Sequence, residues 1–461
     1  NYTSTTLVAD TAIGIGDVVG IAVDCDTGTI KYYLEDTLIH TDTTLTIGEE
    51  VYPTMISTSS STGWGTATFN FGQDSSFAGN KTSGSAAAAD GNGYGDFFYA
   101  PPTGFLALCT QNLPEPTVGL WADGDNQAFK TVTYAGNNST AQDITVGFEP
   151  DLMWIKTRSA AEHHVLIDSI RGLDERLRSN VTTQEYNNAT LITDTSSTGF
   201  TLGTDTAQES NYLTRSYVAW NWKAGGTASS NTDGTITSSV SANVDAGFSI
   251  VSYTGNGTSG ATVGHGLSSA PEMMIVKSRE TTSGGNTNWR VYSKDIGAGY
   301  NLIFGTSALL TQNAWNSTDP TSSVFSLGNH VSTNDNGYDY IAYCFHSVDG
   351  YSKVGSYTGN SSADGTFVYT GFKPAYVMFK KTTGSDNWGI HDSKVNDHEG
   401  NVISPFLKAD SSDAEQDTGD SVDFLSNGFK WRVNSGLRNT SGQTYIYLAF
   451  AEHPFKYSTA R

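Results

Sequence analysis

One pattern recurs three times along this chain, in the same order. The segment at 132–136 returns at 251–255 and at 355–359, each time with a tyrosine two residues before a glycine. Each copy continues to a proline with a lysine six residues later, and closes on an aromatic run 83, 87 or 88 residues after its first tyrosine. The recurring positions are Tyr134, Pro150 and Lys156; Tyr253, Pro271 and Lys277; and Tyr357, Pro374 and Lys380. Such fixed-order self-similarity predicts tandem modules.

The repeat sets the expected domain organisation. Its period of roughly a hundred residues is the size at which one β-sandwich can bury its own core. We therefore predict modules at 117–226, 247–350 and 351–461, with a Gly-, Ser- and Thr-rich linker at 227–246 that contributes an edge strand. Residues 1–115 form a separate domain, bounded by the proline-containing segment 113–116. Three copies of one domain favour a binding or structural protein over an enzyme.

Composition predicts an all-β fold with little helix. Among the 461 residues are 49 glycines, and Ser, Thr, Asn and Asp are abundant, which is typical of short strands joined by turns. The best helix candidate is 168–179, where Ile170, Leu173 and Leu177 share one face and Asp168 is placed as an N-cap.

Charge, cysteines and hydropathy exclude several classes of protein. The formal net charge of −22 would be repelled by a phosphate backbone, so we predict no nucleic-acid partner. The acidic residues are scattered, which favours a self-repelling surface, with a calcium-loaded surface as the alternative. Three cysteines are too few for a disulfide framework or a zinc site. No stretch is apolar for long enough to cross a bilayer as a helix, so no membrane insertion is expected.

The first 115 residues carry their own β pattern. Residues 16–24 and 29–34 predict a hairpin around the turn at 26–28, and residues 66–73 alternate, with two phenylalanines on one face. These segments resemble the C-terminal part of a SPRY domain, a β-sandwich used for protein and ligand recognition. The resemblance implies that the earlier strands lie upstream, are absent, or are replaced by another segment. Residues 78–95 are expected to be a loop, followed by a closing strand region at 99–109.

The repeated part resembles tail-fibre and tail-associated proteins of marine bacteriophages. The resemblance covers about 117–461 and rests on the segments 168–172, 231–234, 248–255, 263–267, 270–277 and 445–455. It implies a structural protein of the virion, with other virion proteins and a host-surface glycan or protein as partners. A homotrimer is expected from the fibre resemblance alone.

Few residues suggest chemistry. His163 and His164 beside Glu162 could share a metal ion or act as an acid–base pair, but the corresponding positions in the other modules are Asn288-Trp289 and Asn387-Trp388. We expect each repeated lysine to close a buried strand with its ammonium at the rim, and each repeated proline to fix the entry of that strand. No nucleophile elbow, zinc-protease helix, P-loop or dinucleotide motif is present.

Tryptophans on a turn-rich background are the remaining candidates for ligand binding. Trp64, Trp289 and Trp388 lie among Ser, Thr, Asn and Gly, where an aromatic face could stack on a sugar ring. The alternative is that Trp289 and Trp388 occupy one position of the repeat and pack in both modules.

The sequence thus predicts a non-enzymatic structural protein of a tailed-phage virion, in a tail fibre or tail tip, that adheres to the host surface. It predicts no catalytic residue, metal or cofactor. Two alternatives stay open, an architectural capsid-decoration or filament-sheath protein and a tailspike-like glycan depolymerase.

Overall fold

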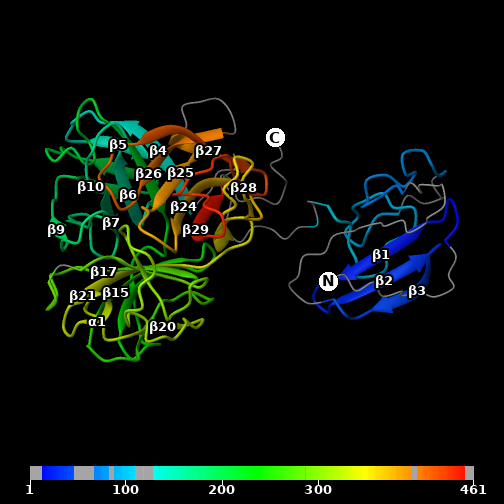
Figure 1. Cartoon of the computed structure of the whole chain (residues 1–461), viewed down its shortest axis with the longest axis horizontal. Helices are drawn as coiled ribbons and strands as arrows, with labels where there is room; N and C mark the ends of the chain where they lie inside the picture. The colour runs from blue at the N-terminus through cyan, green and yellow to red at the C-terminus, as the bar shows by residue number, and fades with distance from the viewer. Residues whose placement is uncertain are drawn as a thin grey trace. The chain divides into compact units, whose positions relative to one another are not determined.

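The computed structural model describes residues 13–45, 67–82, 88–109, 112, 118, 128–285, 287–395 and 402–451. The chain divides into two compact units, Asn1–Pro114 (unit 1) and Glu115–Arg461 (unit 2). The fold is all-β, as the composition predicts, and the ladders between the named strands are antiparallel. Figure 1 shows the strands of unit 2 arranged as several sheets.

Unit 1 contains one described sheet. Its strands are β1 (Val19–Asp24), β2 (Thr29–Leu34) and β3 (Thr37–Asp42), in that order across the sheet. The predicted hairpin is confirmed, because β1 pairs with β2 from Val19↔Leu34 to Asp24↔Thr29. The Asp24 carboxylate accepts hydrogen bonds from the backbone N–H groups of Asp26 and Thr27 and so holds the turn.

Two strand predictions in unit 1 are wrong. Residues 67–73 contain no named strand, and the chain bends at 71–73, where the side-chain oxygen of Asn70 accepts the backbone N–H groups of Gly72 and Gln73. The region 99–109 contains no named strand. There the backbone N–H of Ala107 is bound by the carboxylate of Asp90 and not by a neighbouring strand.

Module 1 is the part of unit 2 from β4 to β12. Its central sheet has the order β4-β12-β6-β7, an outer sheet has the order β10-β11-β5, and β8 pairs with β9. The strands are β4 (Phe129–Ala135), β5 (Gln142–Thr145), β6 (Leu152–Thr157), β7 (Val165–Asp168), β8 (Glu175–Arg176), β9 (Tyr186–Asn187), β10 (Ile192–Ser196), β11 (Gly199–Leu202) and β12 (Ser216–Trp222).

The helix predicted over 168–179 in module 1 is wrong. The carboxylate of Asp168 does accept the backbone N–H groups of Ile170 and Arg171, as an N-cap would. The chain then leaves the helical path at Gly172, whose φ is +95°. Leu177 returns to pair with Leu166 in a β-bridge, so the apolar spacing serves a sheet.

Module 2 runs from β13 to β21. Its central sheet has the order β13-β14-β15-β21-β17-β18-β19, and β16 pairs with β20. The elements are β13 (Ser229–Asn231), β14 (Ser238–Asn243), β15 (Phe248–Thr254), β16 (Ala261–Gly264), β17 (Met273–Ser278), β18 (Arg290–Ser293), β19 (Leu302–Ile303), β20 (Val324–Leu327), α1 (Val331–Asn334) and β21 (Asp339–Phe345). The segment expected as a linker with one edge strand is instead the edge pair β13–β14 of this sheet.

Module 3 runs from β22 to β29 and forms one eight-stranded, nearly closed sheet with the order β22-β29-β24-β25-β26-β27-β28-β23. Its elements are β22 (Ser352–Thr358), β23 (Phe367–Tyr369), β24 (Pro374–Lys381), β25 (Gly389–Asp392), the 3-10 helix η2 (Ser393–Val395), β26 (Val402–Lys408), β27 (Gln416–Leu425), β28 (Gly428–Trp431) and β29 (Thr444–Ala451).

The central sheet of each module is buried on both faces. On β6, Leu152 and Trp154 point to one core, and Met153 and Ile155 point to another. The strands β17 and β24 divide their side chains in the same way. Two buried faces explain why the sequence shows continuous apolar runs here and not the alternation of a half-exposed strand.

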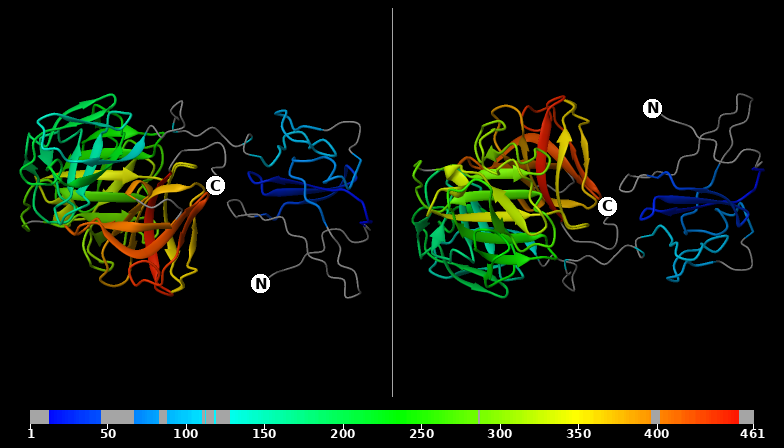
Figure 2. Two further views of the ribbon diagram at one scale, coloured as in Figure 1. Left: turned by 90° about the horizontal axis from the view of Figure 1, so that it is seen from above. Right: turned by 90° about the horizontal axis from the view of Figure 1, so that it is seen from below.

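Each central sheet packs one face into a core that is shared by all three modules, and we call this shared core the axial core. It collects the inward residues of β6, β17 and β24 together with those of β12, β21 and β29. The other face of each sheet packs within its own module. Figure 2 shows the sheets of unit 2 from two further directions. Burial of this shared surface joins the three modules into one hydrophobic unit.

A closed ring of hydrogen bonds surrounds the axial core. Trp289 of module 2 donates its indole N–H to the carbonyl of Arg178 in module 1, at 2.9 Å. Trp388 of module 3 donates to the carbonyl of Ile303 in module 2, at 2.7 Å. His164, which takes the same position in module 1, bonds through Nε2 to the carbonyl of Lys408 in module 3, at 2.9 Å.

A second ring runs through the backbone alone. The N–H of Glu185 bonds to the carbonyl of Arg279 at 2.8 Å, that of Leu309 to Thr382 at 3.0 Å, and that of Glu415 to Arg158 at 2.8 Å. Each bond joins one module to the next. At two of these three junctions an ion pair is added, Arg279 with Glu185 and Arg158 with Glu415, each with atoms 2.8 Å apart.

The three modules are therefore related by a pseudo-threefold arrangement within one chain. Equivalent residues make equivalent contacts from module 1 to 3, from 3 to 2 and from 2 to 1. Each of the tandem repeats contacts both of the others, so the modules are not arranged as independent domains in a row. The faces that three chains would use to form a trimer around this axis are here contributed by one chain.

Candidate functional site

In every module the same set of hydrogen bonds fixes the turn that precedes the last strand, and we call this set the clamp. The closing tyrosines Tyr217, Tyr340 and Tyr445 each donate to a carbonyl nine residues earlier, at 2.6 to 3.1 Å. Each hydroxyl also accepts a backbone N–H five residues earlier, at 2.7 to 2.9 Å. One side chain thus closes the turn that leads into β12, β21 or β29.

A buried asparagine six residues before each tyrosine completes the clamp. Asn211, Asn334 and Asn439 are 0% exposed. Each donates to two loop carbonyls, one of them in the first loop of its module, and each accepts the backbone N–H of Asn137, Asn256 or Asn360 at 2.8 to 2.9 Å. The Asn-x5-Tyr spacing is present in the sequence of every module, although the repeat of the tyrosines alone does not point to the asparagine.

The first tyrosine of each repeat stacks on the last. Ring centroids are 5.2 Å apart for Tyr134 and Tyr217, 5.3 Å for Tyr253 and Tyr340, and 4.8 Å for Tyr357 and Tyr445. The glycine that follows has a steric reason. A Cβ at Gly136, Gly255 or Gly359 would lie 2.3 Å from a backbone oxygen of the clamped turn, so no other residue fits there.

The clamps present three polar loops, 136–141, 255–260 and 359–365, which we call the clamped loops and which are mostly exposed beyond their first glycine. Asn137, Asn256 and Asn360 open these loops, and each accepts the backbone N–H two residues on, at 2.8 to 3.0 Å. This Asx-turn explains why Asn-x-Ser/Thr recurs at the same place in every module. Loops fixed by a rigid scaffold are where proteins commonly place binding residues.

The repeated lysines lie elsewhere, and the expectation that their charges reach the rim is wrong. Lys156, Lys277 and Lys380 are 0% exposed. Their ammonium groups donate to backbone carbonyls, for example Lys156 to Thr157 at 2.6 Å and Lys277 to Thr182 of module 1 at 3.2 Å. Burial lowers the pKa of each lysine to about 8. Backbone carbonyls replace the water that an exposed ammonium would have bound, and for Lys277 one of them belongs to the neighbouring module.

The repeated prolines lie at buried strand entries. Pro374 begins β24, and Pro150 and Pro271 stand two residues before β6 and β17. A strand can begin with a proline, because the missing N–H is not needed by the ladder there.

The tryptophans Trp289 and Trp388, predicted to bind a ligand, are not at the protein surface. Trp289 and Trp388 are 1% and 0% exposed, and their rings pack in the axial core against Phe304. These two rings cannot stack on a sugar at the protein surface. Trp64 lies outside the described residues.

His164 is a structural residue of the axial core. It is 0% exposed, and its Nδ1 accepts the indole N–H of Trp154 at 2.8 Å. Its Nε2 therefore carries the proton donated to Lys408. Burial and the nearby Lys156 hold the pKa of His164 well below its usual range. His163 contacts Asn180 instead, and no group of three or more metal-binding side chains occurs in the described parts of the chain.

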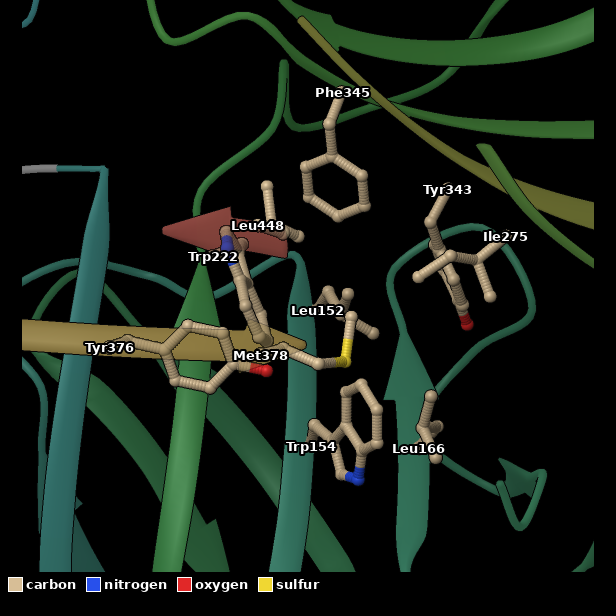
Figure 3. Close-up of a pocket in the computed structure, with 10 residues that line it drawn as sticks. All are labelled: Leu152, Trp154, Leu166, Trp222, Ile275, Tyr343, Phe345, Tyr376, Met378 and Leu448. Carbon is tan, nitrogen blue, oxygen red and sulfur yellow. The ribbon is translucent and has the colours of Figure 1, made fainter. Parts of the chain in front are cut away.

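A small cavity lies where the three central sheets meet (Figure 3). All three modules line it, with Trp154 and Trp222 from module 1, Tyr343 and Phe345 from module 2, and Tyr376 from module 3. Its space is about that of one water molecule. The cavity is a packing defect at the pseudo-threefold axis and offers no room for a substrate.

The arrangement in unit 2 is an all-β scaffold with three rigidly held polar loops. Residues 125–454 match a family described as Domain of unknown function (DUF7483), and the protein belongs to that family. No curated protein and no solved structure matches the chain. Within the described residues no helix has the length and apolarity of a membrane span.

Proposed function

We propose that the protein is a non-enzymatic structural component of a tailed-phage virion, in a tail fibre or tail tip, and that it attaches the particle to a glycan or protein on the host surface. The observation that carries the proposal is the set of three clamped loops. They are exposed, polar and held in one conformation by buried asparagines and tyrosines. Loops that are ordered before binding lose little entropy when a ligand binds.

Three equivalent loops on one chain suit a receptor that repeats. Each loop offers hydroxyl and amide groups, so a single contact with a glycan would be weak. Simultaneous contacts by several loops multiply the affinity without any new interaction. The homotrimer expected from the fibre resemblance would multiply it again, and would have to use surfaces outside the filled axial core.

The loops themselves give the test. We would introduce Thr140→Lys, Thr258→Lys and Ala363→Lys together into the full chain, one in each clamped loop, and measure binding to host cells by flow cytometry. All three positions are exposed. We expect binding to fall by at least about tenfold, since each lysine removes or blocks part of a low-affinity contact. Ser322→Lys, an exposed change outside the clamped loops, is the control.

Unchanged binding by the triple variant would remove the clamped loops from the proposal. Release of oligosaccharides from host polysaccharide by the native chain would favour the depolymerase alternative. The pseudo-threefold symmetry specifically favours the architectural alternative, because such a chain can sit on a threefold axis of a larger assembly. Electron microscopy of the particle that contains it separates an axial position in a shell from a position at the tail tip.

A further inference from the structure

A buried arginine in module 2 has no counter-charge. Arg290 on β18 is 5% exposed, and none of the described carboxylates forms an ion pair with it. Its Nη1 donates to the side-chain oxygen of Asn301 at 2.7 Å, and its Nε has no hydrogen-bond partner. A buried guanidinium without an anion is costly, because desolvation of the charge is not offset.

The histidine beside Arg290 cannot accept a hydrogen bond from it. Nδ1 of His330 accepts the backbone N–H of Ser332 at 3.1 Å, as the N-cap of α1. In the neutral ring the proton is then on Nε2. Burial and the charge of Arg290 lower the pKa of His330 to about 4, so the ring is neutral at pH 7. Nε2 of His330 and Nη2 of Arg290, 3.3 Å apart, are therefore both donors.

A single acceptor placed between these two adjacent donors would satisfy both, and an anion would also offset the charge of Arg290. From these contacts we propose that Arg290 and His330 hold a small monovalent anion, either a free halide or the carboxylate of an acidic sugar. The carboxylate form deepens the proposed attachment function and rests on it, whereas the halide form stands without it.

The site is peculiar to module 2. The position of Arg290 is taken by Val165 in module 1 and by Gly389 in module 3. In module 3 the ring of Phe379 fills the space, since a Cβ on Gly389 would lie 2.3 Å from its Cζ. The fold therefore does not need a charge at this position, and the other modules use apolar groups for it.

Bromide is the probe that tests the site. We expect crystals of the full chain soaked in sodium bromide to show an anomalous peak within hydrogen-bond distance of Arg290 and His330. In solution, chloride and then sodium glucuronate would be titrated while the midpoint of thermal unfolding is followed. A saturable rise with both salts supports the halide source, and a rise with glucuronate alone supports the acidic sugar.

Two variants make the result specific. Arg290→Met keeps the volume and removes the charge, so it should abolish the saturable response and leave the general effect of ionic strength. His330→Asn keeps an acceptor for the N-cap but loses the imidazole donor, and we expect the anion affinity to fall about tenfold. The absence of an anomalous peak together with a native response equal to that of Arg290→Met would overturn the proposal. Loss of host-cell binding by the loop variant bears only on the proposed function.

Discussion

The clamps and the axial core are built from the same repeats, yet they follow opposite rules. At the clamps all three modules use the same residues, an asparagine, two tyrosines and a glycine. In the axial core equivalent positions differ, as in the row Trp220, Tyr343 and Leu448. A clamp is completed inside its own module, so one solution can be copied. At the axis three copies meet, and side chains of complementary size must share one space.

The largest expected effect is in the axial core. Trp220→Ala should destabilise unit 2 by about 4 kcal/mol, because it deletes a fully buried ring and one hydrogen-bond donor to Asp392. Denaturant unfolding followed by tryptophan fluorescence measures this. Tyr300→Ala, at a residue that is 44% exposed, is the control and should change stability little. A loss no greater than that of the control would show that the modules are not joined through this core.

The buried lysines test whether identical residues at equivalent positions of the three modules behave alike. Their pKa values in the folded chain are about 8, below the value in the unfolded chain. Above pH 8 the folded state releases protons first, so the unfolded state binds more of them and stability rises with pH. Full deprotonation is worth up to about 3 kcal/mol for each lysine.

We would compare urea unfolding at about pH 8 and about pH 9, where no more than about one in ten ordinary tyrosines is ionised. Lys277→Met should remove roughly one third of the rise, whereas Lys223→Met, at an exposed lysine, should leave it unchanged. Stability that is flat or falling over this range would contradict the buried, charged state of the three lysines.

The clamps should respond equally in all modules. Asn211→Ala, Asn334→Ala and Asn439→Ala each leave several buried backbone groups unpaired, so we expect each to cost about 2 to 3 kcal/mol. Asn336→Ala, at an exposed site in the same turn, is the matched control. Costs that differ strongly among the three modules would mean that the clamps are not independent local devices.

Making the axial core more symmetric should weaken it. Leu448→Trp places the residue of module 1 into module 3, where Trp222 and Tyr376 already line the same small cavity as Leu448, and should cost about 2 kcal/mol by overpacking. The same substitution at Leu213, which is 56% exposed, should be tolerated. A Leu448→Trp protein more stable than the native one would show that the size of the side chains at Trp220, Tyr343 and Leu448 is not limited by the space in the axial core.

The smallest effect is expected at the cavity. The hydroxyl of Tyr376 is buried and has no hydrogen-bond partner in the structure, so Tyr376→Phe removes an unsatisfied group. The free energy of unfolding should change by less than about 1 kcal/mol, in either direction. A clear loss of stability would reveal a buried water bound to the hydroxyl, and a high-resolution crystal structure would show it.

The fold class could be predicted because composition, apolar runs and turn residues are local features of the sequence. The strands around Met153, Met274 and Val377 are apolar in sequence, and the hairpin around Asp26 follows from turn chemistry. Helix and sheet could not be separated at 168–179, since the spacing of Ile170 and Leu177 fits both. The positive φ of Gly172 takes the chain out of a helical path, and a single glycine in a sequence is a weak signal of such a break.

The candidate sites were harder to predict because they depend on the way modules meet. An apolar run ending in a lysine normally lies at a rim, and nothing near Lys277 in sequence shows that Thr182 of another module covers it. The burial of Trp289 has the same cause. The pairing of Asn334 with Tyr340 was local and repeated, and a search for a second residue at fixed spacing from each tyrosine would have found it.

The closed rings between the modules also change how the assembly responds to dilution. In a trimer of separate chains, each loss of a partner is favoured as the protein becomes more dilute. Here the peptide bond holds every module beside its neighbours at an effective concentration that does not depend on the number of molecules in solution. A single copy released into an open environment would keep its threefold core intact.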